Sequence, residues 1–267
     1  MCRLAAWSGA SPRAAAAAFG DGGVERLVAL GRQHRDGWGT AWRPPSGGLP
    51  QRVRAITSAG EDPAFRAALT GTPTTAGLAH LRWATPGLPV VEANAHPFVV
   101  GDLAMAHNGG IYPLDRVGEI LDPEREARAA GTTDSERYVL AVAARLAASA
   151  DPVTAVSAAV GHLFAGWAPT SLNAVALLPE VLLAVCAFDP EAPVGVPEPA
   201  DEYYAMAWTA NAGGVAVASS GVFPTGDDAW QVLPNPSVLV VPAGGRPTVV
   251  PIDAPIGCHR AAGEQLR

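Results

Sequence analysis

The stretch that decides the fold is residues 1–9, MCRLAAWSG, which places one of three cysteines directly behind the initiator methionine. Residues 3–7 are typical of a short strand, so the simplest interpretation makes Cys2 a small hydrophobic residue at its start. A second interpretation is chemical. Removal of Met1 would leave a thiol and a free amine on one residue, as an N-terminal nucleophile requires. The rest of the sequence has to separate the two.

The composition excludes several classes of protein. The 267 residues include 18 basic and 25 acidic ones, a net charge of −7, and no basic run marks a surface for nucleic acid. Every basic residue is arginine, which excludes Schiff-base and phosphate-loop lysine chemistry. Cys2, Cys186 and Cys258 are too widely spaced for a disulfide framework or a zinc motif. This spacing favours a cytoplasmic protein.

The apolar segments do not predict export or a membrane span. The alanine-rich start is interrupted by Ser11, Pro12 and Arg13, so it lacks the sustained apolar core of a signal peptide. The apolar stretch 172–188 is interrupted by Pro179 and Glu180. We therefore expect no membrane partner.

The pattern of elements predicts an α+β protein with antiparallel sheets and one domain over residues 1–267. Thr133 and Glu136 form a capping box that opens a helix reaching about residue 149. Pro152 opens a second helix, and Pro179-Glu180 is the turn of a hairpin. Residues 189–202 are expected to form a loop rich in proline and acidic residues. Shorter helices are expected at 24–30 and 63–69, and strands at 3–7, 37–43, 52–57, 75–83, 103–107, 173–178, 181–188, 203–209, 215–219 and 237–241.

Five polar clusters lie in apolar surroundings: HRDGWGTAW (34–42), HLRWATPG (80–87), NAHPF (94–98), MAHNGGI (105–111) and GTTDSE (131–136). Each has a purely structural explanation. Asn108-Gly109 is a common hairpin turn, and the three histidines at 80, 96 and 107 could be core residues. No pair of histidines has a recognised metal-ligand spacing, so we expect neither a metal nor a cofactor.

Taken together, the clusters supply what an N-terminal thiol would need for amide hydrolysis. The α-amine of Cys2 would titrate at about 7.7–8.0 and could take the thiol proton. The Asn108 side chain and the Gly109 amide offer two donors to an oxyanion. Arg82 could bind a carboxylate through its planar fork, and Asp134, at a helix start, could hold an ammonium. This pattern favours a substrate with an amino-acid head group.

In this order, MC, DGWG, RWAT, NAHPF, HNG and TDSE resemble the class II glutamine amidotransferase domains, which are N-terminal-nucleophile (Ntn) hydrolases. These motifs span residues 2–136. The later VAVASSG and WQVLPNPSVLVV resemble the closing strands of the standalone branch of that family. The resemblance implies a four-layer αββα sandwich of two antiparallel sheets, with the nucleophile at the end of a strand.

The resemblance also implies residue roles. Cys2 would be the nucleophile after loss of Met1, and Asn108 and Gly109 would form the oxyanion hole. Arg82 would bind the α-carboxylate of the substrate and Asp134 its α-ammonium. The residues implied to line or brace the pocket are Trp83, Thr85 and His96. Cys186 is expected to be a packing residue, Cys258 has no assigned role, and residues 34–36 are expected to form a loop near the pocket.

Two departures bear on the substrate. Pro86 stands where synthetase-linked members usually have histidine, and Ser219-Ser220-Gly221 stands where standalone relatives often have SEP. Because the resemblance covers nearly the whole chain, we expect no synthetase domain within these 267 residues. The expected substrate is glutamine or a γ-glutamyl conjugate, because the standalone branch includes the γ-glutamyl hydrolase of ergothioneine biosynthesis.

Three alternatives stay open. The chain could be a glutaminase subunit that supplies ammonia to a synthetase partner in trans. It could be a non-catalytic relative that binds glutamine or another protein. It could also be an N-terminal-cysteine acylase for apolar amides, although such an enzyme would not need the pair Arg82 and Asp134.

Overall fold

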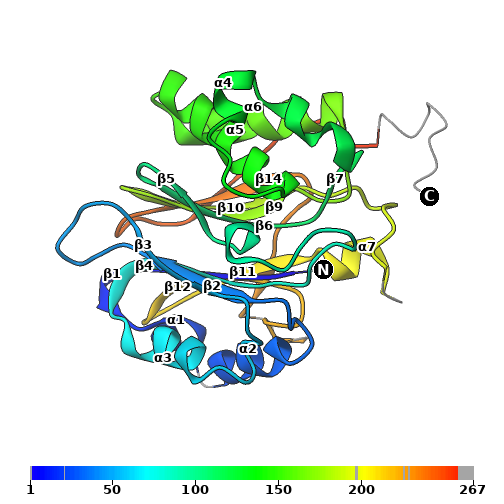
Figure 1. Ribbon diagram of the computed structural model, residues 1–267. Coiled ribbons are helices and arrows are strands. Elements are labelled where there is room, and N and C mark those ends of the chain that lie inside the picture. The colour runs from blue at the N-terminus through cyan, green and yellow to red at the C-terminus, as the bar shows by residue number, and fades with distance from the viewer. Residues whose placement is uncertain (1, 21, 196–197, 225, 228, 258–267) are drawn as a thin grey trace.

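The computed structural model describes residues 2–20, 22–195, 198–224, 226–227 and 229–257. Two antiparallel sheets lie face to face between two layers of helices, as Figure 1 shows. Three hydrophobic cores separate these layers: one between the sheets and one under each helical layer. The predicted α+β sandwich with an αββα arrangement is confirmed.

The first sheet has seven strands in the order β13-β11-β12-β1-β4-β2-β3. β1 lies at its centre and pairs antiparallel with β4 and β12, so the residue that precedes β1 is held against the middle of the sheet. The strands are β1 (Arg3–Arg13), β2 (Trp38–Trp42), β3 (Gln51–Ala55), β4 (Thr74–Leu81), β11 (Met206–Asn211), β12 (Gly214–Ser219) and β13 (Gln231–Val232).

The second sheet has six strands in the order β15-β14-β10-β9-β6-β5. β9 and β10 are joined by the predicted Pro179-Glu180 turn, and Leu178 pairs with Val181. The strands are β5 (Phe98–Val100), β6 (Leu103–Asn108), β9 (Asn173–Leu178), β10 (Val181–Cys186), β14 (Ser237–Pro242) and β15 (Thr248–Pro251); β7 (Ile111–Tyr112) and β8 (Ala168–Pro169) form a separate pair.

Both sheets are buried on two faces, which explains the nearly continuous apolar runs of their central strands. Cys186 lies in the core between the sheets and is 1% exposed. Burial raises the pKa of its thiol to about 12, so Cys186 is the packing residue that the sequence predicts.

The helices cover the outer faces of the sheets (Figure 1). Asp151 caps α6, which begins at Pro152 as predicted. The first sheet carries α1 (Ala15–Phe19), α2 (Gly23–Gly31) and α3 (Pro63–Gly71); the second carries α5 (Asp134–Ala148) and α6 (Pro152–Gly166), with α4 (Pro123–Glu126) and the 3-10 segments η1 (Glu92–Asn94) and η2 (Leu114–Ile120) in the connections.

Several elements differ from the prediction. Tyr203 was expected to begin a strand but ends the short helix α7 (Ala200–Tyr203), and the strand starts at Met206. Pro199 before the helix and Asp201 and Glu202 in its first turn favour the helical start over the strand tendency of the tyrosines. The sequence also missed α1, the short strands β5, β7, β8 and β13, and the edge strand β15.

Two further observations bear on the expectations. Within the described part of the chain, no helix is long and apolar enough to cross a membrane. Cys258 lies outside the described residues, and the single-domain division of the chain stays a prediction.

Candidate active site

Cys2 immediately precedes the central strand β1, and the pairing of Arg3 with Leu81 places it beside the residues that follow β4. The Trp83 amide donates to the Cys2 sulfur over 3.5 Å, and the thiol points back to the Trp83 carbonyl at 3.6 Å. Arg3 Nη1 donates to the Cys2 carbonyl over 3.1 Å, and its guanidinium lies 4.1 Å from the centre of the Tyr203 ring. These contacts fix the residue at the start of the sheet.

The electrostatic surroundings of the thiol are mixed. Burial raises the pKa of Cys2 above its usual value, while the Trp83 amide, Arg82 and Arg3 act in the opposite direction. Because burial dominates, a nearby base has to accept the thiol proton before the sulfur can act as a nucleophile.

Arg82 follows β4 and is only 3% exposed. Its guanidinium contacts main-chain carbonyls: Nη2 donates to Pro89 over 3.2 Å and Nη1 to Asp36 over 3.5 Å. No carboxylate among the described residues forms an ion pair with it. A buried guanidinium with this geometry can accept a ligand carboxylate.

The carboxylate of Asp36 has a different partner. It accepts a hydrogen bond from the Ala84 amide over 2.7 Å, and the Asp36 amide donates to the Arg82 carbonyl over 3.2 Å. Residues 34–36 therefore brace the segment that follows β4, which agrees with the loop expected near the pocket.

Asp134 is the first residue of α5 and is 3% exposed. Its Oδ2 accepts a hydrogen bond from the Ile111 amide over 2.8 Å. Burial raises the pKa of this carboxyl, against the opposing effects of His107 and of backbone amides. A ligand ammonium beside this carboxylate would compensate its buried charge.

Asn108 ends β6, and Gly109 follows it into the pocket wall. β6 pairs with β5 and β9 rather than with the strand after Gly109, so Asn108-Gly109 is not a hairpin turn. A Cβ on residue 109 would lie 2.0 Å from the Ser171 carbonyl oxygen, so only glycine fits. The Asn108 amide is fully buried, and neither of its polar atoms has a hydrogen-bond partner among the described residues.

His107 is a pocket residue that the sequence prediction did not include. Its Nε2 donates to the Ser171 carbonyl over 2.9 Å, which leaves Nδ1 as the acceptor for the Ser135 hydroxyl, also at 2.9 Å. Burial lowers its pKa, against the opposing effects of Asp134 and the Ser171 carbonyl, which favours the neutral ring. His96 also lines the pocket, and its ring lies against that of His80, with centroids 4.1 Å apart and planes tilted by 32°.

One pocket brings most of the predicted residues together. Asn108 is absent from its wall but adjoins Gly109, and Trp83 is 42% exposed at the surface. The lining residues that sequence reasoning missed each lie within the quoted motifs or beside them, so the motifs were the available signal. The pocket is lined by Cys2, Arg82, Trp83, Ala84, Thr85, Leu88, His96, His107, Gly109, Thr133, Asp134 and Ser135. In the described ranges, no group of His, Cys, Asp or Glu is arranged to hold a metal ion.

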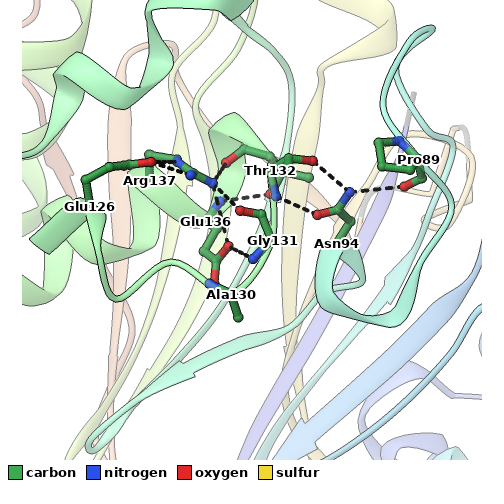
Figure 2. Close-up of polar contacts among 9 residues, drawn as sticks. Pro89, Asn94, Glu126, Ala130, Gly131, Thr132, Glu136 and Arg137 are labelled. Atoms are coloured by element: carbon green, nitrogen blue, oxygen red, sulfur yellow. Dashed lines mark hydrogen bonds and ion pairs between the residues drawn. The ribbon is translucent and has the colours of Figure 1, made fainter.

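A polar network holds the start of α5 (Figure 2). Thr133 caps the helix as predicted, with its hydroxyl accepting from the Glu136 amide over 3.2 Å. The Glu136 carboxylate accepts from the amides of Ala130 at 2.9 Å and Gly131 at 2.7 Å, so this carboxylate fastens the preceding loop. Arg137 donates to the Gly131 carbonyl over 2.7 Å.

A thiol at the start of the central strand of an αββα sandwich, facing a pocket with buried Arg and Asp side chains, defines a class of Ntn-fold proteins. Residues 1–174 match the sequence profile described as "Glutamine amidotransferases class-II". The chain belongs to this family, whose members are enzymes that hydrolyse the amide of glutamine.

Relatives of known name match over a short segment. A glutamine–fructose-6-phosphate aminotransferase from Zymomonas mobilis is 42% identical over 81 residues, which cover 30% of this chain and 13% of that protein. The Brucella suis protein of the same name is 41% identical over 88 residues, covering 33% of this chain and 14% of its own length. The matched segment is thus a small part of these relatives.

Solved structures share the fold over nearly the whole chain. A glutamine aminotransferase class-II domain protein from Silicibacter pomeroyi has a TM-score of 0.64 at 20% identity and covers 95% of this chain and 100% of its own. The glutamine phosphoribosylpyrophosphate amidotransferase from B. subtilis has a TM-score of 0.64 at 12% identity, covering 96% of this chain and 50% of its own.

Proposed function

We propose that the protein is a cysteine amidohydrolase that cleaves the γ-glutamyl amide of glutamine or of a γ-glutamyl conjugate. The observation that supports this most is the shared pocket. Cys2, Gly109, Arg82 and Asp134 come from four separate segments of the chain and line one cavity.

Recognition uses the two buried charges. The guanidinium of Arg82 binds the α-carboxylate as a bidentate fork, and Asp134 accepts hydrogen bonds from the α-ammonium. Their joint use selects a zwitterionic head group and directs the side-chain amide of the substrate toward Cys2. An apolar acyl group would leave both buried charges without a counter-ion, which argues against the acylase alternative.

Acylation requires a base and an oxyanion hole. Removal of Met1 would give Cys2 a free α-amine, which takes the thiol proton as the sulfur attacks the amide carbonyl. The Asn108 amide and the Gly109 N–H stabilise the negative oxygen of the tetrahedral intermediate. The resulting α-ammonium gives its proton to the departing nitrogen, so ammonia or an amine leaves and a γ-glutamyl thioester remains on Cys2.

Hydrolysis of the thioester repeats these roles with water. The free α-amine takes a proton from water as its oxygen attacks the thioester carbonyl. The tetrahedral intermediate collapses, the C–S bond breaks, and the proton returns to the sulfur. Glutamate is released, and the thiol and the amine are regenerated.

A second candidate function is a glutaminase subunit that passes ammonia to a separate synthetase. The observation in its favour is that the relatives of known name are aminotransferases of which the matched segment is only 13–14%. The chemistry at Cys2 is the same in both cases; they differ in whether ammonia is released or transferred. For both candidate functions we propose a cytoplasmic location, as expected from the sequence.

The test is glutamate release from glutamine and from a panel of γ-glutamyl amides, using protein whose intact mass shows that Met1 is absent. We expect release by this protein and none by Cys2→Ala, with an unchanged circular dichroism spectrum. Cys186→Ala is the matched control, because it removes a buried thiol from the inter-sheet core and should keep full activity per folded molecule.

Two outcomes would contradict the proposal. Binding of glutamine without any glutamate release would identify the non-catalytic relative. Activity that survives in Cys2→Ala would show that a residue other than Cys2 is the nucleophile.

A further inference from the structure

The NAHPF motif contains a residue with no role in the proposed chemistry. Asn94 ends η1, is fully buried, and does not line the pocket. A buried side-chain amide that contacts no ligand needs partners within the protein. In Figure 2 its side chain lies between Pro89 and Thr132.

One side of Asn94 faces the arginine. Its Nδ2 donates to the Pro89 carbonyl over 3.1 Å. The same carbonyl oxygen accepts a hydrogen bond from Arg82 Nη2 over 3.2 Å. The Pro89 carbonyl is therefore shared, and its position helps to fix where the Arg82 guanidinium lies.

The other side of Asn94 faces the start of α5. Its Oδ1 accepts from the Thr132 amide over 2.8 Å, and Nδ2 donates to the Thr132 hydroxyl over 3.1 Å. Thr132 lies two residues before Asp134. The packing is close, because a Cβ on Gly131 would come within 2.3 Å of Asn94 Oδ1.

The helix start that Asn94 contacts is also held by hydrogen bonds and an ion pair from α5. The Glu136 carboxylate holds the amides of Ala130 and Gly131, and Arg137 joins the Gly131 carbonyl to an ion pair with Glu126. Movement of Asp134 relative to Arg82 would therefore have to break the contacts of Asn94.

We propose that Asn94 is a positioning residue that sets the separation between Arg82 and Asp134, and through it the spacing of carboxylate and ammonium groups that the pocket accepts. This inference rests on the proposed function. The structural basis is that the Asn94 side chain contacts the Pro89 carbonyl, to which Arg82 also donates. The same side chain contacts Thr132, at the start of the helix that carries Asp134. A ligand held by both charges depends on their separation, whereas a ligand held by one charge does not.

The experiment compares three amides with Asn94→Ser, whose short side chain cannot reach both partners. Glutamine has both head groups, 4-carbamoylbutanoate lacks the ammonium, and 4-aminobutanamide lacks the carboxylate. For glutamine we expect KM to rise about tenfold with kcat within about twofold of wild type. For the two truncated amides we expect KM to change by less than about twofold.

Two further variants complete the test, one that removes a single contact of Asn94 and one that serves as a control. Thr132→Val replaces with a methyl group the hydroxyl that Asn94 Nδ2 contacts, at an exposed position, and should give a smaller shift in the same direction. Glu25→Gln removes the exposed ion pair between Glu25 and Arg66, which contacts neither Asn94 nor the start of α5, so it should leave all three KM values unchanged.

Three results would overturn the inference. The first is an equal rise in KM for all three amides in Asn94→Ser, as a general loss of structure would give. The second is an unchanged KM for glutamine. A wild-type protein that neither binds nor cleaves glutamine would overturn the proposed function and this inference together, which separates that failure from the other two.

Discussion

Asn108 and Asn173 are Cα partners across β6 and β9, and both are fully buried, yet only one of them has its side chain hydrogen-bonded. Asn173 Nδ2 donates to the Tyr204 carbonyl over 2.6 Å, and its Oδ1 accepts from the Ala187 amide over 2.8 Å. Neither polar atom of the Asn108 side chain has a partner among the described residues. A buried amide without partners is costly, so its retention fits a group that binds the reacting oxygen.

This contrast predicts that the same substitution impairs catalysis at one of the two positions only. Asn108→Asp keeps the shape but loses the donor, so kcat per folded molecule should fall by roughly 10²–10³-fold, in addition to any loss of Tm from the buried carboxylate. Asn173→Asp loses the donor to Tyr204 and buries a charge, so it should lower Tm while activity per folded molecule survives. Steady-state kinetics and thermal unfolding of the two variants check this. A wild-type kcat in Asn108→Asp would remove Asn108 from the oxyanion hole.

Gly109 gives a second prediction. A Cβ there would lie 2.0 Å from the Ser171 carbonyl oxygen, and His107 Nε2 donates to that same oxygen. Gly109→Ala should therefore displace the strand end, and we expect a loss of kcat of at least about 100-fold. The matched control is Gly71→Ala at the end of α3, where no atom lies within 4 Å of the added Cβ. Unchanged kcat in Gly109→Ala would contradict the proposed oxyanion geometry.

Much of this site could be predicted because its residues lie in local signals. The helix start at Asp134 follows from Thr133 and Glu136, and strand β1 follows from residues 3–7. The capping box differs from its usual form. The Glu136 carboxylate, which would normally accept from the N-cap amide, accepts instead from the amides of Ala130 and Gly131. That contact depends on how the preceding loop folds over the helix, which local pattern does not encode.

Other features depend on contacts between distant segments. Asn94 acquires its role only when residues 89 and 132 come together, and Tyr203 is helical in a segment that follows Pro199. His107 could not be separated from an ordinary core histidine, because its pocket position depends on Ser135 and Ser171. Sequence therefore predicts which motifs matter better than it predicts how they are braced.

The third prediction concerns acid pH. Burial raises the pKa of Asp134 above its usual value, and only the ionised carboxylate can hold the α-ammonium of the substrate. As pH falls through this raised pKa, Asp134 becomes protonated, which adds a loss of roughly tenfold per pH unit in kcat/KM for glutamine to the loss caused by protonation of the Cys2 α-amine at higher pH. The pKa of an ordinary aspartate would place this loss at lower pH. A kcat/KM profile recorded from pH 8 to pH 4 checks it.

Two variants define this acid limb. Asp134→Asn should have a low kcat/KM for glutamine at all pH values and lack the part of the acid limb due to Asp134. Asp151→Asn is the control, because Asp151 only caps the remote helix α6 and should leave the profile unchanged. An unaltered acid limb in Asp134→Asn would assign the titration to another group.

The last prediction concerns stability. His80 and His96 are buried side by side, and burial lowers the pKa of both well below the usual value. A histidine with a depressed folded-state pKa binds fewer protons when folded than when unfolded at mildly acidic pH. Such a histidine therefore leaves the free energy of unfolding unchanged above its unfolded-state pKa of about 6.5. Below that pH it lowers the free energy of unfolding, until the pH reaches its folded-state pKa. Each such histidine should lower the free energy of unfolding by up to about 1.4 kcal/mol per pH unit in this window.

Urea unfolding between pH 7.5 and pH 5 should show this slope, and His80→Gln should reduce it whatever its effect on absolute stability. His162→Gln, at an exposed position on α6, should reduce the slope much less, and an equal reduction by both variants would contradict the assignment to the buried pair.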